Sequence, residues 1–183
     1  RPHFAGIDRC DSVVIDPHKW LFAPFDCCAL LYRRPEVARL AHAQHASYLD
    51  PINAGSEWNP TDYGHFLTRR ARGLPFWFSL AVHGTRAYSE AVERTLEVTR
   101  AGAVLVDAAP HLDLIMDPVL SVLAFRRIGW EQADYDAWSV RLMEDGTAFV
   151  LPTQVDGEPA LRICIVNPLT TVDDIDMILD SLA

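Results

Sequence analysis

Lys19 is notable for its chemistry, because it is the single lysine among the 16 basic residues of this 183-residue chain. A primary amine forms an imine with an aldehyde, and a guanidinium cannot replace it in that reaction. Lys19 follows an apolar run, and we expect partial burial there to favour the uncharged, reactive amine. The residue type therefore indicates carbonyl chemistry. A plain surface lysine in a strand-to-loop turn is the alternative.

Tyr63 is a second candidate. It lies within residues 44–68, which lack apolar periodicity and are punctuated by prolines and glycines. Loops of this length without their own structure are uncommon in compact domains and are usually functional or disordered. A phenol can donate a proton in a site closed to water. We predict a functional loop, with an exposed tyrosine on an irregular segment as the alternative.

Three arginines, Arg69, Arg70 and Arg72, follow this loop. Their planar guanidinium groups could bind a carboxylate or a phosphate. They could equally form a solvated helix start or a dimer-interface cluster. His42 and His45 have a loose metal-ligand spacing, but no carboxylate or cysteine partner lies in range, so we expect no metal site.

The elements that must position these groups follow from apolar patterning. Residues 12–16 and 27–32 are typical of buried strands, and Pro35 starts a short helix that ends near residue 42. A long helical region covers residues 74–105, with Gly84 inside it. Beyond Pro110 we predict strands at 112–116, 119–125, 147–151 and 161–166, and helices at 131–144 and 172–182, the last with a capping box of Thr171 and Asp174.

Composition excludes several classes of protein. Half of the residues are hydrophobic and 22% are charged, which is typical of a globular domain. A net charge of −9 argues against nucleic acid or an anionic membrane as the main partner. No apolar run is long enough to span a membrane. The four cysteines show no zinc-site or disulfide-framework spacing, so we expect a reducing, cytoplasmic location.

Two longer motifs resemble a known family. Asp-Pro-His-Lys-Trp at 16–20, followed by Phe-Asp-Cys at 25–27, is similar to the cofactor-lysine segment of the pyridoxal-phosphate-dependent group II amino-acid decarboxylases, the aromatic-L-amino-acid decarboxylase branch in particular. Leu-Thr-Arg-Arg-Ala-Arg-Gly-Leu-Pro-Phe-Trp at 67–77 resembles the family's stretch after its mobile loop. The resemblance spans essentially the whole chain, but only the C-terminal part of the family's length.

The resemblance implies roles for individual residues. Lys19 would form the Schiff base with pyridoxal 5′-phosphate, and His18 would lie near the cofactor phosphate. Asp16, where the aromatic branch usually has asparagine, would also belong to the cofactor site. Thr-Asp-Tyr at 61–63 resembles the mobile-loop motif, whose tyrosine donates a proton after decarboxylation. Phe25 and Arg70 would lie at the substrate site or dimer interface.

The implied fold is α/β: the end of the large domain of a fold-type I pyridoxal-phosphate enzyme, followed by a small α+β domain. We expect residues 1–47 to belong to the large domain, 48–70 to the mobile loop, 71–109 to a connecting helical region and 110–183 to the small domain. The chain would be the C-terminal piece of a longer homodimeric enzyme with active sites at the interface. We expect it to be inactive alone.

The implied function is decarboxylation of an L-amino acid, aromatic by preference, to the amine and carbon dioxide. The alternatives are another fold-type I lyase, an aldehyde-forming decarboxylase, and a non-catalytic remnant that acts as a binding module. The residues that shape the side-chain pocket of the family lie largely upstream of this chain, so the sequence does not identify the amino acid.

Overall fold

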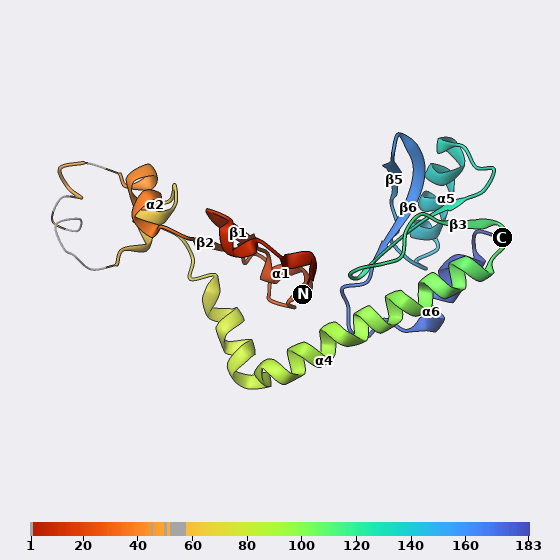
Figure 1. The fold of residues 1–183 in the computed structure, drawn as a ribbon, viewed down its shortest axis with the longest axis horizontal. Coiled ribbons are helices and arrows are strands. Elements are labelled where there is room, and N and C mark those ends of the chain that lie inside the picture. The colour runs from red at the N-terminus through yellow and green to blue at the C-terminus, as the bar shows by residue number, and fades with distance from the viewer. Residues whose placement is uncertain (1, 45, 50, 52–57) are drawn as a thin grey trace. The chain divides into compact units, whose positions relative to one another are not determined.

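The chain forms two compact units in the computed structural model, which describes residues 2–44, 46–49, 51 and 58–183. Unit 1 is Arg1–Val82 and unit 2 is His83–Ala183 (Figure 1). His45, named above as half of a possible metal pair, lies outside the described residues.

Unit 1 is built around an antiparallel two-stranded ribbon. Its strands are β1 (Ser12–Ile15) and β2 (Ala29–Tyr32), with Ser12 opposite Tyr32 and Ile15 opposite Ala29. Pro17 ends β1, because proline donates no hydrogen bond to a ladder, and it opens the single-turn helix α1 (Pro17–Trp20). The other elements of the unit are η1 (Pro2–Phe4), η2 (Ile7–Arg9), α2 (Pro35–His42) and η3 (Pro60–Tyr63).

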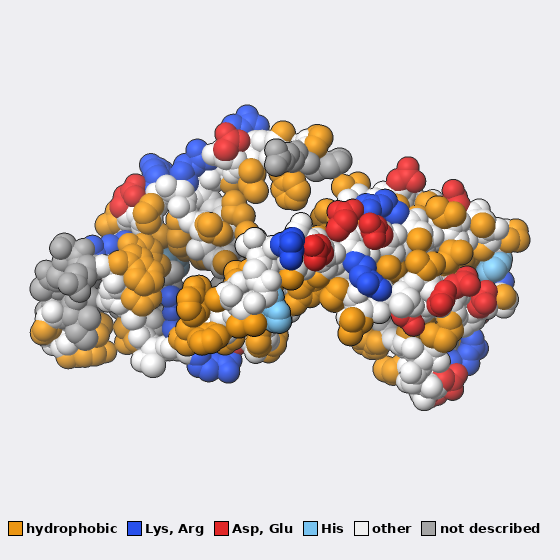
Figure 2. Space-filling view, turned by 90° about the horizontal axis from the view of Figure 1, so that it is seen from below, with side chains coloured by type: hydrophobic (Ala, Val, Ile, Leu, Met, Phe, Trp, Pro, Cys, Tyr) orange, Lys and Arg blue, Asp and Glu red, His pale blue; other side chains and the backbone are white. Residues whose placement is uncertain are grey.

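The prediction that residues 12–16 and 27–32 form buried strands is correct for the strands and wrong for their burial. Both strands are shorter than predicted, and the side chains of Val14, Ile15, Leu30 and Leu31 are exposed. Two strands alone cannot cover both of their own faces. Hydrophobic side chains accordingly gather on the surface of unit 1 (Figure 2).

The long helix α4 (Gly73–Ala108) confirms the predicted helical region, and the structure adds an interruption at Gly84. Gly84 has φ 75° and ψ 160°, a conformation that side chains with a Cβ rarely adopt. The division between the two units falls beside this residue. Beyond it, Thr95, Val98, Gly102 and Val106 are buried at helical spacing, so one face of the helix belongs to the core of unit 2.

Unit 2 is a four-stranded antiparallel sheet packed against helices, as the α+β prediction requires. The strand order is β3-β4-β6-β5. The strands are β3 (Leu112–Leu114), β4 (Val122–Arg127), β5 (Pro152–Val155) and β6 (Glu158–Cys164). The helices are α5 (Gln132–Glu144) and α6 (Val172–Asp180).

The predicted strand at 147–151 is wrong, because the strand begins at Pro152, one residue after the predicted strand ended. Asp156 and Gly157 form a two-residue turn in which both have positive φ, and this turn sets the pairing of Val155 with Glu158. The other three strands of unit 2 are found, with their ends shifted by a few residues. The turn chemistry, rather than the apolar run before it, fixes the register.

The core of unit 2 includes one apolar face of the final helix, although Val172 at its start is exposed. Ile175, Ile178, Leu179 and Leu182 pack with the inner face of the sheet and with α4. The helix starts at the predicted capping box: the backbone N–H of Asp174 donates to Thr171 Oγ1, and the Thr171 N–H donates to the Asp174 carboxylate. The Thr171 hydroxyl also donates to this carboxylate, at 2.9 Å, and the two bonds from Thr171 lower the pKa of Asp174 because they favour its charged form.

Gly102 provides a test of this packing. A Cβ at this position would lie 3.1 Å from Ile175 Cγ2 and 3.2 Å from Leu123 Cδ2. We expect Gly102→Val to overpack the core and to destabilise the protein by about 1–3 kcal/mol. Thermal unfolding measures the change. Glu97→Val places the same residue on the exposed side of α4, and it should cost only the small difference in helix propensity. Equal losses in the two variants would contradict the packing.

Candidate active site around Lys19 and Tyr63

Lys19 lies on helix α1, directly after the strand that the sequence placed before it. Its Nζ donates to Asp16 Oδ2 at 2.6 Å, and its backbone N–H donates to the Asp16 carbonyl at 3.0 Å. The side chain is 66% exposed. The expected partial burial of Lys19 is therefore wrong for this chain, for the same reason that the strands are exposed. What the structure shows instead is an ammonium group paired with a carboxylate three residues earlier.

Asp16 joins two groups near the end of β1. The hydrogen bond from Lys19, with a second one from the Cys28 thiol, lowers the pKa of the Asp16 carboxyl. Desolvation of the Cys28 thiol raises its pKa, and the Asp16 carboxylate raises it further. Asp16 is thus an anion, and Cys28 stays protonated at neutral pH.

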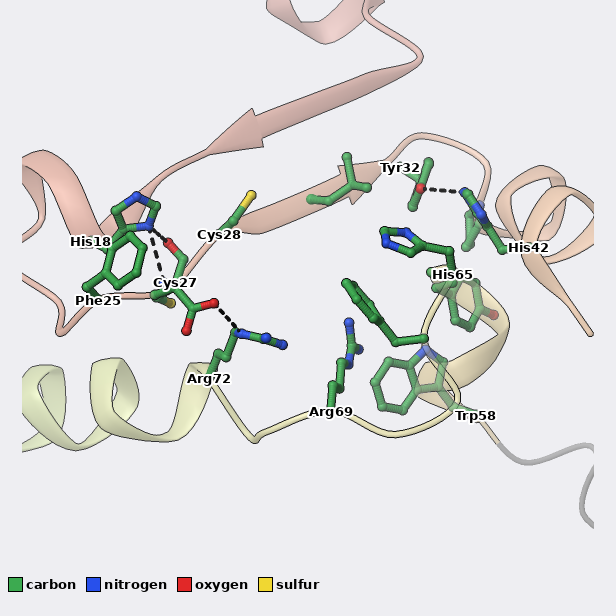
Figure 3. Close-up of a pocket in the computed structure, with 16 residues that line it drawn as sticks. His18, Phe25, Cys27, Cys28, Tyr32, His42, Trp58, His65, Arg69 and Arg72 are labelled. Carbon is green, nitrogen blue, oxygen red and sulfur yellow. Dashed lines mark hydrogen bonds and ion pairs between the residues drawn. The ribbon is translucent and has the colours of Figure 1, made fainter.

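The Cys27 carbonyl holds the segment that carries Lys19 through contacts with its neighbour His18. This oxygen accepts from the backbone N–H of His18 at 3.3 Å and lies 2.5 Å from His18 Nδ1 (Figure 3). The ring of Phe25 meets the His18 ring edge-on, with centroids 5.2 Å apart. These contacts fix His18, and with it the neighbouring lysine, against the chain that leads into β2.

The arginines after the loop bind a carboxylate of the chain itself. Arg72 Nε donates to Asp26 Oδ2 at 2.8 Å, and Arg70 donates to the other oxygen of the same carboxylate. The Arg72 guanidinium, and less strongly that of Arg70, holds the pKa of Asp26 below its usual range. Arg70, predicted at a substrate site or interface, is here paired with the neighbour of Phe25. Arg72 also lies over the Phe66 ring.

Tyr63 is the last residue of η3, and it is half-buried. Its ring stacks on Trp58 with centroids 6.0 Å apart and planes 20° apart. The preceding residue, Asp62, is buried and forms an ion pair of 2.9 Å with Arg39 on α2. The Asn59 side chain caps η3 by accepting from the Thr61 N–H. Part of the predicted structureless loop is therefore ordered around Tyr63.

His18, Phe25 and Tyr63 share one open cleft of about 840 Å³ in unit 1 (Figure 3). Its other walls come from β2, α2 and the chain before α4. The residues of this wall include Cys27, Cys28, Tyr32, His42, Trp58, His65, Phe66, Arg69 and Arg72. Lys19, Asp16 and Arg70 are not among the described residues that line it. The structure thus brings three of the six predicted site residues to one cavity and places the other three beside it.

Asp26, Asp62 and Arg39 are the site residues that sequence reasoning missed. Asp26 and Asp62 stand inside the motifs quoted above, so their positions were visible while their roles were not. Their partners lie 44, 46 and 23 residues away in the chain, and no local pattern reveals such pairs.

Comparison with known families identifies the chain. Residues 1–128 match the model of the pyridoxal-dependent decarboxylase conserved domain. The chain belongs to this family. Pyridoxal phosphate is accordingly the cofactor of the family, which confirms the resemblance carried by the Pro-His-Lys-Trp and Phe-Asp-Cys motifs.

Two curated relatives of this family member are named as decarboxylases of different amino acids. Aromatic-L-amino-acid decarboxylase of Bacillus atrophaeus is 28% identical over 178 residues, which cover 92% of this chain and 37% of the relative. L-2,4-diaminobutyrate decarboxylase of Rhizobium meliloti is 31% identical over 190 residues, which cover all of this chain and 38% of the relative. The chain therefore spans less than two-fifths of the length of either relative.

Solved structures confirm the fold. The structure of Oryza sativa TDC with PLP and tryptamine matches 98% of this chain with a TM-score of 0.86 at 22% identity, and the match covers 40% of that chain. Mouse CSAD in its apo form matches 97% with a TM-score of 0.80 at 23% identity, again over 40% of that chain. At these identities the likeness is one of fold, and it supports the α/β assignment.

Two features are absent from the residues that the structure describes. None of their helices combines the length and the apolar character that crossing a bilayer requires. No group of three or more histidine, cysteine or acidic side chains among them is arranged to hold a metal ion.

The donor set around Lys19 fits a pyridoxal cofactor at its aldehyde end. An exposed primary amine on a short helix, oriented by a carboxylate, can reach a carbonyl carbon. The imidazole of His18 is held beside it by the Cys27 backbone. The negatively charged Asp16 carboxylate pairs with the lysine ammonium, and it would repel a phosphate rather than bind it.

The lowered pKa of Asp26 gives a pH prediction. A carboxyl whose pKa is depressed in the folded state stabilises that state above its ordinary pKa of 3.8, and the effect is lost as the pH falls through the folded value. We expect Asp26→Asn to unfold at a lower temperature than the wild type at pH 7. The difference should shrink below about pH 4. A difference that stays constant from pH 7 to pH 3 would show that the ion pairs with Arg70 and Arg72 contribute nothing.

Proposed function

We propose that the protein containing this chain is a pyridoxal-phosphate-dependent amino-acid decarboxylase that releases the amine and carbon dioxide. The observation that carries this proposal is the position of Lys19. The sole lysine of a chain in this family stands in the Pro-His-Lys-Trp motif, on an exposed turn whose neighbours fix its backbone. The relatives named as decarboxylases support an L-amino acid as substrate, and those named for aromatic-L-amino acids support the aromatic preference.

Lys19, His18 and Asp16 would hold the cofactor. Lys19 would bind its aldehyde, and His18 would lie against its phosphate. Asp16 would act through Lys19, because their 2.6 Å ion pair orients the amine and keeps a proton close to it. Pyridoxal phosphate, when bound, supplies a ring that accepts the electron pair left by the departing carbon dioxide.

Tyr63 would donate the proton that completes the amine. Its hydroxyl belongs to a half-buried ring stacked on Trp58, at the wall of the cleft that His18 and Phe25 also line. A proton donor is effective where water is excluded, and the apolar rings of Phe25, Trp58 and Phe66 along this cleft would help to exclude it once the site is covered.

The exposure of Phe25 supports a homodimer with active sites at the interface, where Phe25 and Arg70 would lie at the substrate site or the interface. The Phe25 side chain is 85% exposed although it is a large aromatic ring. Exposed apolar groups of this size often mark surfaces that another chain covers. The same proposal includes a large-domain part that ends at residue 47, a mobile loop at 48–70, a connecting helical region at 71–109 and a small domain at 110–183. It also includes a cytoplasmic location and the inactivity of this chain by itself.

Replacing Lys19 tests the cofactor assignment. We expect Lys19→Arg, in the protein expressed from its complete gene, to lose the visible absorbance of the bound cofactor, because a guanidinium keeps the charge but does not bind the aldehyde. Amine formation should fall by about a hundredfold or more. Arg86→Lys, on the exposed surface of α4, is the reverse exchange and should change neither quantity. Unchanged absorbance in Lys19→Arg would refute the assignment.

Replacing Tyr63 tests the proton donor and separates the amine-forming reaction from an aldehyde-forming one. We expect Tyr63→Phe to keep the cofactor spectrum and to lower amine production by about a hundredfold. Product analysis by chromatography measures the amine and any aldehyde. Tyr48→Phe removes a hydroxyl from an exposed ring earlier in the same stretch and serves as the control. If amine output from Tyr63→Phe equals that of the wild type, Tyr63 is not the donor.

A further inference from the structure

The segment that carries Tyr63, residues 58–72, is tied to its surroundings by two carboxylates. Asp62 binds Arg39 at 2.9 Å, and Asp26 binds Arg70 and Arg72. The first contact lies directly before Tyr63, and the second lies at the end of the segment. The sequence motifs and the comparisons assign no role to either carboxylate.

Asp62 fixes the near end of the segment. Its side chain is only 5% exposed, so the ion pair with Arg39 is shielded from water on the aspartate side. Separating a buried carboxylate from its cation leaves an uncompensated buried charge, which is strongly unfavourable. The contact therefore holds Asp62 in place. Tyr63 is the next residue, so the ion pair that holds Asp62 against Arg39 of helix α2 also sets the position of the Tyr63 backbone.

Asp26 fixes the far end and links it to the cofactor lysine. Each oxygen of its carboxylate binds a different arginine, Arg72 at 2.8 Å and Arg70 at the other oxygen. In the sequence, Asp26 lies between Phe25 and Cys27. The ring of Phe25 contacts His18, and the carbonyl of Cys27 contacts the His18 ring and its backbone N–H, next to Lys19. The same short loop therefore contacts both the lysine turn and the end of the Tyr63 segment.

We propose that Asp26 and Asp62 are positioning residues, which hold the Tyr63 segment directly before the tyrosine and at the C-terminal end of the segment, and so keep Tyr63 at the wall of the cleft that His18 also lines. This inference rests on the proposed function, in which Tyr63 donates a proton. Neither aspartate touches the reacting atoms in this account. Each acts through Tyr63.

A double-mutant cycle separates positioning from general damage to the fold. In the protein expressed from its complete gene, we expect Asp62→Asn and Asp26→Asn each to lower kcat for amine formation by about tenfold to a hundredfold, since small misplacements of a reacting group cost rates of that order. The cofactor spectrum should be retained. Combined with Tyr63→Phe, each aspartate change should lower kcat by less than about twofold more, because residues that act as a unit are not additive.

Glu93→Gln is the matched control. It breaks the 2.8 Å pair between Glu93 and Arg100 on the exposed surface of α4 and should leave kcat unchanged. Effects of the aspartate changes that multiply with that of Tyr63→Phe, or a kcat equal to that of the wild type, would overturn the positioning role.

Hydrogen exchange of the backbone at residues 58–66 provides a readout that needs no activity. We expect both aspartate variants to exchange faster there than the wild type, with no change in β6 of unit 2. Unchanged exchange at residues 58–66 would overturn the anchoring, whatever the activity. A wild-type protein that binds no cofactor and forms no amine would instead refute the proposed function, and the two failures are thus distinguishable.

Discussion

The site depends on one backbone oxygen, the carbonyl of Cys27. It meets both the backbone and the ring of His18, and so it folds the chain between β1 and β2 back on itself. That closure places Lys19 on a one-turn helix with Asp16 as its ion partner. It also places Asp26, the next residue toward the N-terminus, where its carboxylate can bind Arg70 and Arg72. A helix of four residues has no stability of its own, so the position of the lysine is set by these contacts.

The two units bury their apolar residues to different extents. Unit 2 encloses Phe125, Trp138, Leu161 and Ile175 between its sheet and its helices, and these side chains are almost fully buried. Unit 1 has a two-stranded ribbon whose apolar side chains remain exposed. This contrast accords with a chain that spans less than two-fifths of its curated relatives. The exposure of the ribbon also explains why Lys19, which follows β1, is more exposed than a lysine at the end of a buried strand.

Local signals in the sequence predicted the elements better than the contacts between them. The final helix α6 and its Thr171 cap follow from the local sequence pattern, and so does the helical region that contains Gly84. The prediction of a strand at 147–151 was wrong because the Asp-Gly turn at 156–157, rather than the apolar run before it, sets which residues pair. The motifs identified Lys19 and Tyr63 as candidates. The ion pairs of Asp26 and Asp62 join distant residues, so only the folded chain shows them.

The central claim is that Lys19 anchors pyridoxal phosphate in the natural protein. Borohydride converts an imine into a stable secondary amine, so reduction of the protein from its natural source, followed by mass spectrometry of its peptides, tests the claim directly. We predict a phosphopyridoxyl group on Lys19 and on no other residue of this chain. An unmodified Lys19 in protein reduced with the cofactor present would contradict the account and would favour a binding module derived from such an enzyme.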